Sequence, residues 1–238
     1  MVELTQTDYI NTVFIVLVIF LLLFVGFKLI AKYFKLKDKL LLYLGLSLVT
    51  QIFTWLASFI NFIFILQTGN MMPYEMNLLI TNGFPVPLIF WMLVWTNLMY
   101  KEKKKLLFTV FMIYWLVMEV IFFYLFFTDP TSMVVYNGYM QTEIGPFPIL
   151  RNLGNMVISI ITVALFYRES HKSDNPEVRL RGTLFLAGVI LVFIGVILLT
   201  ITGLAIFPLL AFIPAVLSYY YGLNMPNWIK ERLHRKEE

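Results

Sequence analysis

The sequence predicts an all-α integral membrane protein of the cell membrane, a seven-transmembrane-helix bundle with its N-terminus outside and its C-terminus in the cytoplasm. Composition gives the first reason, because 60% of the 238 residues are hydrophobic and only 13% are charged. Charged residues make up about 25% of an ordinary soluble domain. Length gives the second, since seven apolar segments have the roughly 20 residues that a helix needs to cross the hydrocarbon layer. The third is that basic residues cluster between alternate segments.

The predicted spans fill most of the chain. They run over about 9–31, 40–66, 77–100, 106–127, 147–167, 183–202 and 205–223. We therefore assign residues 1–223 to one transmembrane domain. We assign residues 224–238 to a basic amphipathic cytoplasmic tail.

Two places in these spans need separate justification. The third span contains GFPVP, where Pro85 and Pro87 must bend the helix or interrupt its hydrogen bonds. The last two spans share one apolar run that is too long for a single crossing, so we divide it at a tight turn near Gly203. Gly188 and Gly195 lie seven residues apart on one face of the sixth span. This spacing fits close packing against the seventh span or a seam between two copies.

The basic residues set the orientation. The chain has 18 lysines and arginines, and with seven spans all except Arg151 fall on one side of the membrane. They form four clusters, within residues 28–39, 101–105, 168–181 and 230–236. The positive-inside rule makes that side cytoplasmic. The basic excess therefore reflects orientation in lipid, and we expect no nucleic-acid partner.

The second span carries a polar stripe in SLVTQIFTWLASFIN, residues 47–61. Its polar residues recur at steps of four, three, four and three, which places them on one helix face: Ser47, Gln51, Thr54, Ser58 and Asn61. Such side chains often hold membrane helices together by hydrogen bonds. They can equally form the wall of a ligand pocket, and the sequence leaves both interpretations open.

Two ionisable residues are predicted inside the bundle. Glu119 is the only carboxylate well inside any span, and Arg151 lies about one turn inside the fifth span. Consecutive helices are usually neighbours, so the two side chains are expected to pair. An unpaired ion at that depth costs about 3 kcal/mol, which pairing or protonation of Glu119 would relieve. A headgroup anchor is the alternative role for Arg151.

The polar residues of spans two to five concentrate in their outer halves and predict a shared ligand site. The candidate ligand-binding residues are Gln51, Ser58, Asn61, Asn82, Trp115, Glu119, Arg151, Asn152 and Asn155. The sixth span is apolar from Leu184 to Leu199. We therefore expect a cavity that is open outward and sealed below the level of Gln51.

Several kinds of chemistry are excluded by the residues present. The chain has no cysteine and only two histidines, His171 and His234, both outside the predicted spans. We therefore expect no metal site and no cofactor. The last span has no lysine for a retinal Schiff base, and no phosphate-binding loop or nucleophile elbow occurs. We do not expect an enzyme, although a lipid reaction that depends on the Glu119 carboxylate remains an alternative.

The order of spans, the uneven loops and the segment YYYGLNMPNWIKERL after the last span carry a whole-chain resemblance. The chain resembles the arrangement of G-protein-coupled receptors and, more narrowly, the seven-helix sensor region at the N-terminus of some prokaryotic histidine kinases. It lacks DRY and NPxxY motifs, and Asn224 and Pro226 in NMP do not match the second. Sugar transporters of the SWEET type share the span count, but their proline-glutamine signature and triple-helix repeat are not evident.

This resemblance implies a stand-alone, receptor-like sensor that binds a small polar or amphiphilic ligand in the outward cavity. Because no kinase output domain follows, we expect a separate cytoplasmic signalling partner at Lys101–Lys105 and Arg168–Arg181. The alternatives are a small-solute transporter or channel that uses the same cavity, and a structural subunit of a membrane complex. Membrane lipids are expected partners of the tail, whose Trp228 would face lipid. A frayed basic end is the alternative for the tail.

Overall fold

The computed structural model describes residues 2–83, 86–100, 102–136 and 142–234. Pro85, Lys101 and the end of the tail, residues 235–238, lie outside the described residues. The elements in chain order are α1 (Gln6–Leu36), α2 (Lys39–Thr50), α3 (Phe53–Thr68), α4 (Tyr74–Thr81), α5 (Val86–Met99), α6 (Lys104–Thr128), the 3₁₀ turn η1 (Pro130–Ser132), β1 (Val134–Tyr136), β2 (Thr142–Ile144), α7 (Pro146–Ser170), α8 (Pro176–Thr202), α9 (Ile206–Leu223) and α10 (Asn227–His234).

Seven helical stretches of the described residues are long and apolar enough to cross a membrane. They are α1, α2 with α3, α4 with α5, α6, α7, α8 and α9. The all-α class and the count of seven apolar helices are confirmed, and together they indicate a multi-pass membrane protein. Most helices are longer than the predicted spans because polar caps extend them. Thr5 and Asp8, for example, form a capping box that starts α1 at Gln6.

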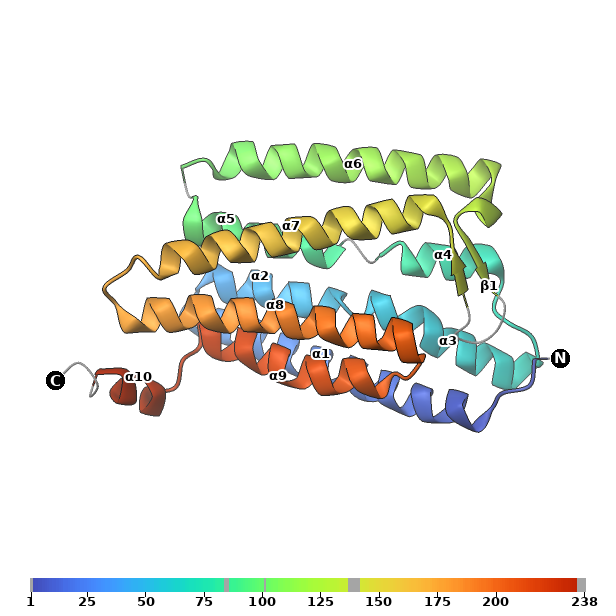
Figure 1. Cartoon of the computed structure of the whole chain (residues 1–238), viewed down its shortest axis with the longest axis horizontal. Coiled ribbons are helices and arrows are strands. Elements are labelled where there is room, and N and C mark those ends of the chain that lie inside the picture. The colour runs from blue at the N-terminus through green and yellow to red at the C-terminus, as the bar shows by residue number, and fades with distance from the viewer. Residues whose placement is uncertain (1, 84–85, 101, 137–141, 235–238) are drawn as a thin grey trace.

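Six of the seven spans follow one another in a ring around a central space. In order around the ring they are α1, α2–α3, α4–α5, α7, α8 and α9, and α9 returns to α1. The helix α6 lies outside this ring, along α5 (Figure 1). The N-terminus and α10 lie at opposite ends of the bundle (Figure 1). We call these the N-terminal end and the inner end.

Small residues allow the first two spans to approach closely. A Cβ atom added to Gly26 would lie 3.0 Å from the Gly45 carbonyl oxygen and 2.7 Å from Cγ2 of Val49. A Cβ atom on Gly45 would in turn lie 2.8 Å from the Gly26 carbonyl oxygen. The backbones of α1 and α2 therefore touch, which is the contact that small residues permit between membrane helices.

The predicted turn between the last two spans is confirmed. Gly203 ends α8 with φ of +68°, a left-handed conformation that glycine adopts without strain. The buried side chain of Asn11 on α1 holds this turn at two points. Its Nδ2 donates to the Gly203 carbonyl at 3.0 Å, and its Oδ1 accepts from the Ala205 N–H at 2.9 Å.

The two glycines of α8 pack against α9 as the first of their two interpretations predicts. Gly188 lies against the ring of Tyr219, and Gly195 lies against Ala211 and the backbone of Pro208. This face is covered within the chain, so it does not offer a seam to a second copy.

Two spans are interrupted near the middle of the bundle. The break after Asn82, between α4 and α5, adjoins the predicted proline site. The break at Gln51 was not predicted, because the polar stripe reads as one continuous helix. There the Thr50 hydroxyl donates to the Leu46 carbonyl at 2.7 Å, and the Ile52 N–H bonds to Val49 instead of one residue earlier. Such bonds from a hydroxyl to the preceding turn bend helices.

A short hairpin at the N-terminal end was also missed by the sequence analysis, which reads this segment as a loop. Strand β1 pairs antiparallel with β2, and Val134 lies opposite Ile144. The preceding Met133 is fully buried and packs with Leu78 and Phe122. The hairpin is thus fixed to α4 and α6 beside the central space.

Candidate ligand-binding site

Arg151 and Glu119 form the predicted ion pair, and Asn82 bridges them. Arg151 Nη1 lies 3.9 Å from Glu119 Oε1 and donates to Asn82 Oδ1 at 2.6 Å. Asn82 Nδ2 in turn donates to Glu119 Oε2 at 2.8 Å. Both charged side chains are buried, and the guanidinium also lies over the ring of Phe122. Because the two charges pair, neither is buried alone in the bundle, where an unpaired charge would be unfavourable.

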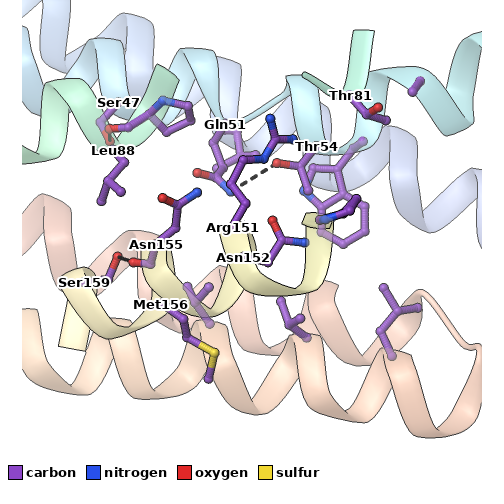
Figure 2. A pocket seen from close by; sticks show the side chains of 18 of the residues that line it. Ser47, Gln51, Thr54, Thr81, Leu88, Arg151, Asn152, Asn155, Met156 and Ser159 are labelled. Atoms are coloured by element: carbon purple, nitrogen blue, oxygen red, sulfur yellow. Dashed lines mark hydrogen bonds between the residues drawn. The ribbon is translucent and has the colours of Figure 1, made fainter. Parts of the chain in front are cut away.

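A cavity of about 580 Å³ fills the space inside the ring of spans. This volume lies within the range of about 300–1,000 Å³ typical of ligand pockets. Side chains from all seven spans and from the hairpin line it, and Figure 2 shows part of the wall. In that view the amides of Gln51 and Asn155 point into the cavity from opposite walls.

The predicted site residues divide into two groups. Six of the nine line the cavity: Gln51, Ser58, Asn61, Arg151, Asn152 and Asn155. The other three, Asn82, Trp115 and Glu119, are not part of its wall. Glu119 and Asn82 lie behind Arg151 and hold its guanidinium, so they act on the cavity through that residue.

The polar stripe of the second span makes hydrogen bonds to other segments and also lines the cavity. At its two ends the side chains bond outside their own helix. Ser47 donates to the Pro87 carbonyl at 2.9 Å, and Asn61 Oδ1 accepts from the Met72 N–H at 2.8 Å. In the middle, Gln51 donates to Thr54 at 3.3 Å, a bond within the wall that leaves both side chains facing the cavity.

The contact between α6 and α7 contains polar atoms that no described residue satisfies. They are Trp115 Nε1, Glu119 Oε1, Arg151 Nε and Asn155 Nδ2, all buried. Tyr114 on α6 reaches Asn155 Oδ1 at 3.4 Å, so this contact is polar along more than one turn. Buried polar atoms in native proteins are nearly always bonded, with ordered water included.

The cavity extends deeper than the sequence predicts. We expected a seal below the level of Gln51, but the lining continues past Ser47 to Leu44, about two helical turns further toward the inner end. The expectation was wrong because it assumed that the apolar residues of the inner half pack against one another, whereas Leu44 and Leu88 line the cavity.

An aromatic cluster forms the floor instead. Trp91 lies 5.7 Å from Phe185 and 6.0 Å from Tyr219 between ring centroids, and Phe185 lies 5.5 Å from Phe166. Trp91 Nε1 also donates to Thr162 at 2.9 Å. These packed rings form the inner end of the cavity. Sequence reasoning missed these residues, since aromatic side chains in apolar runs carry no periodic signal.

Comparison of the chain with protein-family models, curated proteins and solved structures finds no match. Within the described residues, no group of three or more histidine, aspartate or glutamate side chains is placed to hold a metal ion. The site is therefore interpreted from its own geometry. It is a sizeable internal cavity with one polar band, one buried ion pair behind its wall and a closed aromatic floor.

Proposed function

We propose that this protein is a receptor-like membrane sensor that binds a small polar or amphiphilic ligand in the central cavity. The observation that carries the proposal is the cavity itself, about 580 Å³ inside a ring of six spans and closed at one end by Trp91, Phe185 and Tyr219. In this proposal the cavity is reached from the N-terminal end and closed at the other, an arrangement that suits detection more directly than passage.

In this proposal the N-terminal end faces outside and the inner end faces the cytoplasm. The distribution of basic residues supports this orientation, because the described clusters all belong to segments at the inner end (Figure 1). Lys103, Lys105 and Arg168 are exposed there. They offer a positively charged surface to a separate signalling partner, and the positive-inside rule places such a surface in the cytoplasm.

The link from cavity to partner surface would run through the ends of α7 and α8. Both helices line the cavity, and residues 171–175 join them in a short loop at the inner end. A ligand that draws the cavity walls together would shift this loop. The ligand must bind one arrangement of the helices better than the other for such a shift to occur.

Native mass spectrometry of the chain released from lipid nanodiscs tests the binding step. We expect a bound small molecule on the unmodified chain and its loss in Gln51→Leu, which removes a polar group from the cavity wall. Gln67→Leu is the matched control, because Gln67 is an exposed residue of the same type at the end of α3. Retention of the bound molecule in Gln51→Leu would place it elsewhere.

A transporter that uses the same cavity is the second candidate, and one observation favours it. Both α2–α3 and α4–α5 are broken where they line the cavity, and discontinuous helices near the midplane are typical of transporter sites. Uptake of the co-purified molecule into liposomes separates the two functions. Saturable uptake by the unmodified chain would support the transporter. A change in the fluorescence of a dye attached to Ser173→Cys when the molecule binds, without uptake, would support the sensor.

A further inference from the structure

Helices α7 and α8 pack tightly at the inner end and separate toward the N-terminal end. Gly182 lies directly against Ser170, and the rings of Phe166 and Phe185 meet edge to face. From this contact the two helices diverge in Figure 1. The contacts between Gly182 and Ser170 and between Phe166 and Phe185 thus lie in the inner halves of the two helices.

Residues in the outer halves of these two helices belong to the cavity wall. On α7 they include Asn152 and Met156, and on α8 they include Val192 and Val196. Asn152 and Val196 are exposed as well as lining the cavity. Because lining residues are exposed here, we place the opening of the cavity between α7 and α8, where apolar spans are surrounded by lipid chains. We call this opening the α7–α8 portal.

Hydrogen-bonding and apolar side chains gather in different parts of the cavity. The polar groups Gln51, Arg151 and Asn152 lie in its middle part. The part nearer the aromatic floor is mainly apolar, with Leu44, Leu88, Val189, Val216 and Trp91, and the hydroxyls of Ser47 and Ser159 there are bonded to backbone carbonyls. A lipid in the leaflet at the N-terminal end has the same polarity, with its head toward that end and its chain toward the midplane.

The charge of the cavity wall limits which classes of head group can bind. Among the described residues that line the cavity, Arg151 is the only one with a charged side chain. Its charge is offset by Glu119 at 3.9 Å, and Asn82 bonds to both. An anionic head would have to compete with Glu119, and a cationic head would meet Arg151. An uncharged head with hydroxyl or amide groups can bond to Gln51 without disturbing the pair.

From these observations we infer that the cavity binds a single-chain amphiphile with an uncharged, hydrogen-bonding head group, of the monoacylglycerol class. It enters from the surrounding leaflet through the α7–α8 portal. Its head lies against Gln51, and its chain runs toward Trp91. This inference rests on the proposed function in one respect, that the cavity is a ligand site.

Tryptophan fluorescence reads out this binding directly. Trp91 lies at the apolar end of the cavity, whereas Trp95, Trp115 and Trp228 do not line it. A variant that keeps Trp91 and replaces the other four tryptophans by phenylalanine is placed in phosphatidylcholine nanodiscs. Dibromostearoyl glycerol is then added, because bromine on an acyl chain quenches a tryptophan that it touches. We expect saturable quenching, at a concentration about tenfold lower than for dibromostearic acid.

Two matched substitutions test the route. Val196→Phe narrows the portal and should raise the half-saturating concentration about tenfold. Val120→Phe adds the same bulk to the exposed face of α6, which is outside the ring, and should leave it unchanged. Equal effects of the two variants, or quenching that rises in proportion to lipid content without saturating, would overturn the inference. Tighter binding of dibromostearic acid would overturn the uncharged head.

Native mass spectrometry of the unmodified chain with stearoyl glycerol or stearic acid repeats the comparison if the single-tryptophan variant does not fold. It also separates the two proposals. Should the chain carry a different small molecule and reject stearoyl glycerol, the ligand class is wrong and the cavity remains a ligand site. Should it carry no molecule that depends on Gln51, the proposed function fails together with the inference.

Discussion

Arg151 and Glu119 approach to 3.9 Å in the interior of the bundle, and Asn82 bonds to both side chains. The three residues come from three different spans, so this contact ties α4, α6 and α7 together at one depth. It also fixes the guanidinium in the cavity wall. The pair therefore has a structural role and a role in setting the charge that a ligand meets.

Removing the charge of Glu119 should destabilise the protein. Glu119→Gln keeps an oxygen acceptor for Asn82 but leaves Arg151 buried without a counter-charge, which costs about 3–5 kcal/mol when one partner of a buried pair is removed. Arg151→Gln should cost a similar amount. The double variant should be more stable than either single variant, because no unpaired charge remains. Reversible unfolding in mixed micelles measures all three.

Glu75→Gln provides the control for that series. Glu75 is an exposed carboxylate in the first turn of α4, where a substitution changes stability by about 0.5 kcal/mol or less. Single and double variants that add independently would contradict the pairing.

Asn11→Ala should also destabilise the bundle, by about 1–3 kcal/mol. The substitution leaves the Gly203 carbonyl and the buried Ala205 N–H without their side-chain partner. Asn70→Ala, at an exposed loop position, is the control and should have the same free energy of unfolding as the unmodified chain. Hydrogen exchange should show faster exchange at the α8–α9 turn in Asn11→Ala alone. Unchanged exchange there would show that the turn needs no clamp.

Gly26→Val should separate α1 from α2. Its side chain would enter the space occupied by the Gly45 carbonyl and Val49, and overpacking of this kind costs about 1–3 kcal/mol. Ala31→Val adds comparable bulk to an exposed position of the same helix and should be nearly neutral. Thermal unfolding in detergent measures both, and equal melting temperatures would mean that the close contact contributes nothing.

The spans could be predicted from the sequence because each depends on local composition. The sequence alone shows the long apolar runs and the glycine at position 203 between the last two spans. It also shows one carboxylate, Glu119, and one arginine, Arg151, inside the spans. The ion pair was predictable for the same reason, since neither charge is stable alone in lipid.

The order of the spans around the ring was not predictable in this way. Nothing local places α6 outside the ring, so Glu119 and Trp115 were expected on the cavity wall and instead lie off it. Near the break at Gln51, Ser47 bonds to the Pro87 carbonyl, and Thr50 bonds to the Leu46 carbonyl of its own helix. The first bond joins two spans, and the sequence pattern contains no sign of it. The depth of the cavity was underestimated because apolar residues such as Leu44 were expected to pack against other helices and instead line the cavity.

The central claim is that the cavity is reached from the N-terminal end and closed at the inner end, and cysteine accessibility tests it most directly. The chain has no cysteine, so Ser58→Cys in the cavity wall can be the only thiol, with Gly69→Cys and Ser173→Cys marking the two ends of the bundle. A small, membrane-impermeant thiol reagent is applied to sealed vesicles of each orientation. We expect Ser58→Cys to react from the side on which Gly69→Cys reacts and to stay unmodified from the Ser173→Cys side. Reaction from the Ser173→Cys side, or from neither side, would contradict the account.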